Sequence, residues 1–174
     1  MEFKIVLAGP AKTGKSSFLK KILFEENTFT DTYKPTLGVE VYPLKLNTNY
    51  GQVQLNIWDC AGDDRFGGLK NGYYLNANGA IIMADNNIET LNLIGEQINS
   101  IENIAGHIPT SIVINKCDLL DETSIHHNYY QQFSDDNPEI ITLSTKNDDH
   151  VEMHEPLLLL LRKITNNNHL LFIW

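Results

Sequence analysis

The most specific pattern in the chain lies near its N-terminus, where residues Gly9 to Ser16 read G-x-x-x-x-G-K-S. In a loop of this kind, backbone N–H groups surround a β-phosphate and the N-terminus of the following helix adds positive charge. We expect Lys15 to reach the β- and γ-phosphates, and the Ser16 hydroxyl to bind Mg²⁺. The pattern follows a strand-like run and opens a helix-like one, which is the context it requires. The remaining residues of the predicted phosphate-binding loop are Lys12, Thr13, Gly14 and Ser17.

A second pattern, D-x-x-G, runs from Asp59 to Gly62 at the end of a strand-like segment. An aspartate at that strand end faces the phosphate loop and can hold Mg²⁺ through water. Because glycine has no side chain, the Gly62 N–H can approach a γ-phosphate closely. On its own D-x-x-G is a weak signal, and a turn after a strand is its default interpretation. After a phosphate-binding loop it becomes a strong one.

A third pattern, N-K-x-D, covers Asn115, Lys116 and Asp118 and follows the apolar run 111–114. It therefore lies at the carboxyl end of a predicted strand, where α/β sheets bind ligands. The aspartate carboxylate can accept hydrogen bonds from N1–H and the 2-amino group of guanine, and adenine does not offer that pair of donors. The next strand ends in Ser144, Thr145 and Lys146, which we expect to complete the base site.

Strand-like and helix-like segments alternate along the chain, which predicts a doubly wound α/β fold. We expect a six-stranded, mostly parallel sheet with one antiparallel edge strand and about five helices, forming a single domain over residues 1–174. The glycine-rich stretch after Gly62 is expected to be mobile. The predicted strands are 3–8, 39–47, 52–59, 80–84, 111–114 and 139–143, and the predicted helices are 15–25, 88–101, 124–134 and 152–166.

Composition excludes several classes of function. The chain has 13 basic and 22 acidic side chains and a formal charge of −9, so general binding of nucleic acid or anionic membranes is not expected. Two cysteines cannot form a disulfide framework, which favours a reducing compartment. The longest apolar runs, such as Leu157 to Leu161, are far shorter than the ~20 residues of a membrane span. We also expect no signal peptide and no lipid anchor.

The order of these motifs, with Thr36 between the first two, resembles the Ras superfamily of small GTPases over nearly the whole chain. Within that superfamily the chain is most similar to the Ran family. The segments that carry this closer likeness are 36–41 (TLGVEV), 64–74 (DRFGGLKNGYY) and 80–83 (AIIM).

The resemblance implies further roles. Phe29 would stack on the guanine, Tyr33 would cover the phosphates near the reacting centre, and Thr36 would bind Mg²⁺ and the γ-phosphate. The bound ligands would be GTP or GDP with Mg²⁺. The expected partners are nuclear transport receptors of the importin-β type, engaged by a monomer found in nucleus and cytoplasm. The resemblance leaves the exchange factor and the GTPase-activating protein (GAP) unidentified.

Four departures from the Ran pattern matter. Asp63 stands where the family carries the Gln that orients the attacking water. Ala11 and Lys12 replace glycines of the loop, and 126–131 replaces a basic patch. The acidic tail is missing, although a shortened chain would end in the same way.

Three hypotheses follow. The first is a Ran-like switch with slow hydrolysis, and the second is a GTP-loaded decoy that occupies transport receptors without turnover. The third is a P-loop kinase acting on a nucleotide or small metabolite, for which the N-K-x-D pattern would have no explanation.

Overall fold

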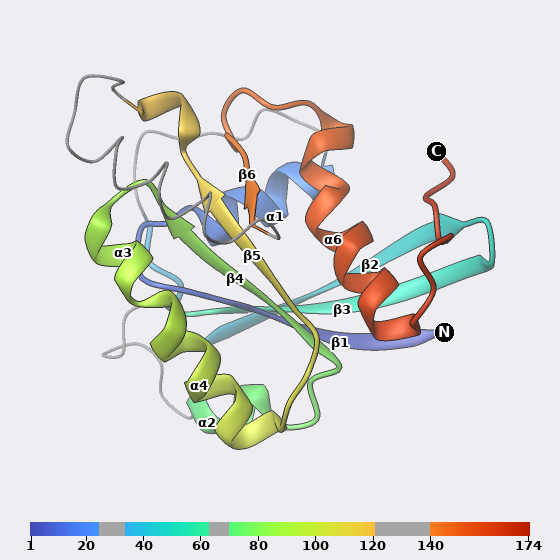
Figure 1. Ribbon diagram of the computed structural model, residues 1–174, viewed down its shortest axis with the longest axis horizontal. Coiled ribbons are helices and arrows are strands. Elements are labelled where there is room, and N and C mark those ends of the chain that lie inside the picture. Colours follow the sequence, from blue (N-terminus) through green and yellow to red (C-terminus); the bar gives the residue numbers. More distant parts are fainter. Residues whose placement is uncertain (25–33, 63–69, 121–139) are drawn as a thin grey trace.

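The computed structural model describes residues 1–24, 34–62, 70–120 and 140–174 (Figure 1). Its centre is a six-stranded sheet with the strand order β2-β3-β1-β4-β5-β6. The β2–β3 pair is antiparallel and the other neighbouring pairs are parallel. This arrangement confirms the predicted fold, including the antiparallel edge. The strands are β1 (Glu2–Ala8), β2 (Val39–Thr48), β3 (Gly51–Cys60), β4 (Gly79–Asp85), β5 (Thr110–Asn115) and β6 (Ile141–Thr142).

The central strands follow from continuous apolar sequence. Every residue of β4 is buried, as expected for a parallel strand covered on both faces. By contrast, the buried side chains of β2 are confined to Leu46 and Thr48 near its end, because this strand lies at the edge of the sheet. The edge position of β2 therefore leaves most of its side chains unburied, whereas β4 lies in the interior of the sheet.

Helices cover both faces of the sheet (Figure 1). On one face, α1 (Lys15–Phe24) and α6 (His150–Thr165) pack against alternate side chains of β1, β3 and β4. On the other face lie α2 (Lys70–Tyr74), α3 (Ile88–Asn92) and α4 (Ile94–Ala105). Two apolar cores result, and the strands between them are fixed from both sides.

Several local predictions need correction. The helix predicted over 88–101 is divided at Leu93, whose N–H bonds to the Thr90 carbonyl at 3.3 Å and so tightens the turn. The short helix α2 was not predicted. The last strand is confined to two residues, whereas α6 begins two residues earlier than expected because Asp149 and Glu152 form a capping box. The predicted helix 124–134 and most of the glycine-rich stretch lie outside the described residues.

The chain end folds back along the tip of the β2–β3 hairpin (Figure 1). The Asn49 N–H donates to the Leu171 carbonyl at 3.1 Å, and the Ile173 N–H donates to the Asn47 carbonyl at 2.9 Å. On α6 the buried His154 ring meets the ring of Trp174 edge-on, with centroids 4.7 Å apart. No helix in the described part of the chain has the length and apolar character to cross a bilayer.

Candidate functional site

The loop between β1 and α1 requires glycine at two positions. Gly9 has φ of +139°, and a Cβ there would lie 2.0 Å from the Met83 carbonyl oxygen of β4. Gly14 has φ of +96°, and a Cβ there would lie 2.3 Å from the Asn115 amide nitrogen. Both positions combine a left-handed backbone with close packing, which other residues cannot tolerate. The loop is thereby pressed against the ends of β4 and β5.

Lys15 is the first residue of α1 and its side chain is directed back over the loop. Its ammonium donates to the carbonyls of Gly9 and Pro10, each at 2.8 Å, and the residue is buried. The Thr13 hydroxyl also donates to the Pro10 carbonyl, at 3.0 Å. The Lys15 and Thr13 side chains thus both bond to carbonyls at the start of the loop. Lys12 is exposed and has a left-handed φ of 67°.

The three predicted metal ligands meet at the start of α1. The Ser16 hydroxyl donates to Asp59 Oδ2 at 2.5 Å and lies 3.0 Å from the Thr36 hydroxyl oxygen. These side chains come from the phosphate loop, the end of β3 and the segment before β2. Since they are separated by 20 and 43 positions in the sequence, the fold alone brings them together.

The second carboxylate oxygen of Asp59 makes this group of side chains suitable for binding a hard cation. Oδ1 is buried and has no hydrogen-bond partner among the described residues. Burial raises the pKa of the Asp59 carboxyl, and the Ser16 hydrogen bond and the Lys15 charge offset part of that rise. A buried, unpartnered carboxylate oxygen beside two hydroxyls matches the oxygen ligands that Mg²⁺ prefers. In the described part of the chain, no three His, Cys, Asp or Glu side chains gather into an alternative metal site.

Gly62, just past β3, lies directly against the phosphate loop. A Cβ at this position would come within 2.5 Å of the Lys15 ammonium and 2.6 Å of the Ala11 backbone nitrogen. The lack of a side chain at Gly62 therefore lets the end of β3 pack directly on the phosphate loop. Any side chain at Gly62 would displace the loop residues that we expect to hold phosphate.

Asn115 links the phosphate loop to the predicted base site. Its side-chain amide donates to the Thr13 carbonyl at 2.9 Å and accepts from the N–H and the hydroxyl of Thr145, both at 2.9 Å. The residue is 1% exposed. All three of its hydrogen bonds go to protein, so its role is to fix the neighbouring loops.

Lys116 and Asp118 have different partners. The Lys116 ammonium donates to Asp85 Oδ2 at 2.7 Å, and its backbone is left-handed with φ of 63°. The Asp118 carboxylate is exposed and accepts from the Ser144 hydroxyl at 2.6 Å. Lys146 is also exposed. The 144–146 segment therefore lies beside the N-K-x-D segment.

Sequence reasoning missed three supporting residues. Asp85 bonds Lys116, Asp148 accepts from the Ser144 N–H at 2.6 Å, and the Lys21 ammonium donates to the Thr145 and Asp148 carbonyls. Asp85 could have been suspected, because it ends the buried strand next to the one that leads into Asn115. Three predicted residues, Phe29, Tyr33 and Asp63, lie outside the described residues.

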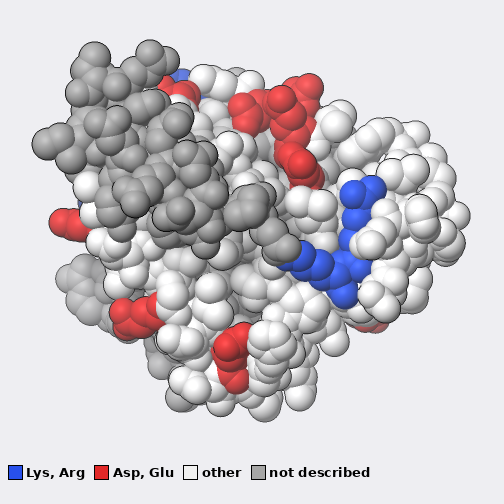
Figure 2. Space-filling model, viewed as in Figure 1, with Lys and Arg blue, Asp and Glu red and all other residues white. Residues whose placement is uncertain are grey.

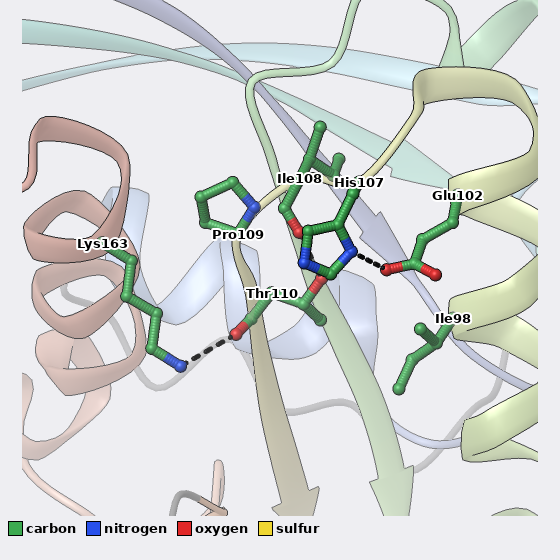
Figure 3. Close-up of a pocket in the computed structure, with 7 residues that line it drawn as sticks. All are labelled: Ile98, Glu102, His107, Ile108, Pro109, Thr110 and Lys163. Carbon is green, nitrogen blue, oxygen red and sulfur yellow. Dashed lines mark hydrogen bonds and ion pairs between the residues drawn. The ribbon is translucent and has the colours of Figure 1, made fainter.

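A separate hollow of about 400 Å³ lies at the opposite end of β5 (Figure 3). Figure 3 shows Lys163 of α6 directed toward Thr110, and His107 directed toward Glu102 of α4. Thr110 begins β5 whereas Asn115 ends it, so this hollow does not belong to the phosphate site. On the face seen in Figure 2, acidic side chains are scattered and basic side chains gather mainly in one area.

The site combines a buried carboxylate and two hydroxyls beside a glycine-bounded loop with a second group of polar loops at the ends of β5 and β6. This arrangement is that of an α/β protein that binds a nucleoside phosphate. The family model described as Ras family matches residues 4–166 of the chain. Because this match covers most of its length, the chain belongs to the Ras family. Members of this family are GTP-binding switches that bind guanine nucleotide with Mg²⁺ and hydrolyse GTP.

Proposed function

We propose that this protein is a Ran-like switch that binds GTP or GDP with Mg²⁺ and engages importin-β-type transport receptors in its GTP form. The convergence of Ser16, Thr36 and Asp59 supports the nucleotide part of this proposal most directly. In these positions Ser16 and Thr36 would bind Mg²⁺ directly and Asp59 would do so through water. The nuclear and cytoplasmic location that we propose follows from the same likeness to Ran.

The switch depends on two segments that contact the phosphate loop. Thr36 leads into β2, and its hydroxyl oxygen lies 3.0 Å from that of Ser16. Gly62 follows β3 and packs on Lys15. A γ-phosphate offers acceptors to both segments, whereas GDP lacks them. We therefore expect GTP to draw both segments toward the loop and GDP to release them.

Phosphate binding requires Lys15 to change partners. Its ammonium bonds two carbonyls of its own loop, and a β,γ-phosphate would replace them with charge-assisted hydrogen bonds. The Lys15 charge would then lie against the oxygens that gain charge as the γ-phosphoryl group leaves. Mg²⁺, when bound, supplies further neutralisation of the phosphate charge.

Hydrolysis is expected to be slow because of Asp63. The attacking water has to be oriented by a group that both donates and accepts, as a glutamine amide does. An ionised aspartate can only accept, and its side chain is one methylene shorter. Its charge would also oppose the growing negative charge on the γ-phosphate. We expect Tyr33 to cover the phosphates near the reacting centre.

The receptor part of the proposal is supported by segments 36–41 and 64–74, which are the parts of the sequence most similar to Ran. It is tested by capturing a purified importin-β-type receptor on the immobilised protein, loaded with a non-hydrolysable GTP analogue or with GDP. We expect capture with the analogue and little with GDP. Failure of the analogue-loaded protein to capture receptor would contradict this part of the proposal.

Asp63 also favours a second candidate function. A protein that holds GTP without turnover would act as a decoy, occupying transport receptors without cycling. The nucleotide that copurifies with the protein separates the two candidates. GTP retained through a long preparation would favour the decoy, and GDP would favour the slow switch.

A further inference from the structure

Asp85 is the last residue of β4, and in the sheet register it lies opposite Asn115 of β5. The motif that we expect to bind guanine begins at that position. Asp85 is 9% exposed, so its carboxylate is largely removed from water. A carboxylate held in this way requires partners, because burial of an unpaired charge is costly.

One carboxylate oxygen of Asp85 holds the lysine of the N-K-x-D motif. Oδ2 accepts from the Lys116 ammonium at 2.7 Å, and the Lys116 side chain is 31% exposed. Lys116 has a left-handed backbone, and its side chain reaches back to the end of β4. A lysine side chain has four rotatable bonds, and this ion pair restricts their freedom.

The other oxygen attaches the same group to α3. Oδ1 accepts from the Thr90 hydroxyl at 2.7 Å and from the Asn87 N–H at 3.3 Å. Asn87 is itself the N-cap of α3. The Asp85 carboxylate is therefore held from a second direction, so it is a fixed anchor for Lys116.

This anchor determines which carboxylate Lys116 pairs with. Asp118 is two positions from Lys116 and is exposed, and within the described part of the chain it accepts a hydrogen bond from Ser144. A carboxylate offers about four acceptor sites, so Asp118 can accept further hydrogen bonds. As long as Lys116 is paired with Asp85, its ammonium does not compete for that capacity.

We propose that Asp85 is a positioning residue that retains guanine nucleotide by holding Lys116 beside the base and away from Asp118. This inference rests on the proposed function, because it assumes that Asp118 accepts from guanine. Without the Asp85 charge, Lys116 would gain freedom and pair with Asp118. Guanine would then compete with an ammonium for the same acceptor.

The test is the rate at which a fluorescent GDP analogue is released into excess unlabelled GDP with Mg²⁺ present. Replacing Asp85 with Asn should accelerate release about tenfold, since the negative charge that pairs with the Lys116 ammonium is lost. Asp85→Ser, a second neutral variant that can still accept from the Asn87 N–H, should behave in the same way. Asp85→Glu should restore most of the slow release. The matched control is Glu102→Gln, which removes a carboxylate paired with His107 at the far end of β5 (Figure 3) and should leave the rate unchanged.

Two further measurements separate positioning from a general structural effect. Single-turnover hydrolysis of GTP that is already bound should be unchanged in Asp85→Asn, because Asp85 does not touch the phosphates. In a Lys116→Met background, Asp85→Asn should have no additional effect on release, because there is no ammonium left to redirect.

Wild-type release rates in both neutral variants would overturn the inference. So would an undiminished effect of Asp85→Asn in the Lys116→Met background, since the carboxylate would then act through α3. If the wild-type protein binds no GDP at all, the proposed function itself is wrong, and this result is distinguishable from the other two.

Discussion

The Ser16 hydroxyl donates to the Asp59 carboxylate at 2.5 Å, joining the phosphate loop to the end of β3. The contact leaves the other Asp59 oxygen buried without a partner among the described residues. Burial of this oxygen without a partner makes the Asp59 charge costly. A bound Mg²⁺ would offset that cost, so we expect nucleotide binding and the stability of this corner to be coupled.

Asp59→Asn should separate these two effects. Without nucleotide and metal, the variant should be more stable than wild type by about 1 kcal/mol, because a neutral amide costs less to bury than a carboxylate. Its gain in melting temperature from GDP with Mg²⁺ should be much smaller than that of wild type. Thermal melts with and without Mg²⁺ measure both, with Glu102→Gln as a control. An undiminished Mg²⁺ response in the variant would show that Asp59 has no part in metal binding.

Asn115→Ala should destabilise the protein even without ligand. The substitution removes three hydrogen bonds in a buried position and leaves the Thr13 carbonyl and the Thr145 N–H unpaired. We expect a loss of about 2–3 kcal/mol in the free energy of unfolding, measured by urea denaturation of the nucleotide-free protein. The exposed Asn99 on α4 provides the matched alanine control. If the two variants unfold alike, Asn115 does not support the loops as described.

Much of the sheet could be predicted from the sequence, and so could the grouping of Ser16, Thr36 and Asp59. Buried strands β4 and β5 have continuous apolar sequence, and each motif has a spacing tied to its chemistry. The contacts of Asn115 with Thr13 and of Lys116 with Asp85 could not be predicted. They depend on which strands become neighbours, and a local pattern does not contain that information. The tight turn at Leu93 escaped prediction because apolar spacing continues through it.

Asp63→Gln should raise the rate of GTP hydrolysis. An amide can orient water by donating and accepting, and it removes a negative charge near the γ-phosphate. Asp63→Asn is the informative comparison, because it removes the charge without extending the side chain. Single-turnover assays of all three proteins would show whether charge or reach limits the reaction. If Asp63→Gln is no faster than wild type, Asp63 is not the cause of slow turnover, and the decoy hypothesis loses its main support.

Asp118→Ala should weaken GTP binding and narrow the difference in affinity between GTP and ATP. The Asp118 carboxylate is the acceptor that we expect to pair with N1–H and the 2-amino group of guanine, and alanine leaves both donors without a partner. ATP binding should change little, since adenine does not present this pair of donors. Equilibrium competition against a fluorescent GDP analogue measures both affinities. Equal losses for GTP and ATP would show that Asp118 supports the loop instead of reading the base.

Calorimetric titration of nucleotide-free protein with GDP, GTP and ATP in the presence of Mg²⁺ tests most directly whether the protein selects guanine. We expect tight binding of both guanine nucleotides and binding of ATP at least about a thousandfold weaker, because the proposed base site consists of directional hydrogen-bonding groups. Removal of Mg²⁺ should weaken GTP binding, since the metal ion would no longer link the phosphates to Ser16, Thr36 and Asp59. ATP binding as tight as GTP binding would contradict the assignment of this protein as a guanine-nucleotide switch.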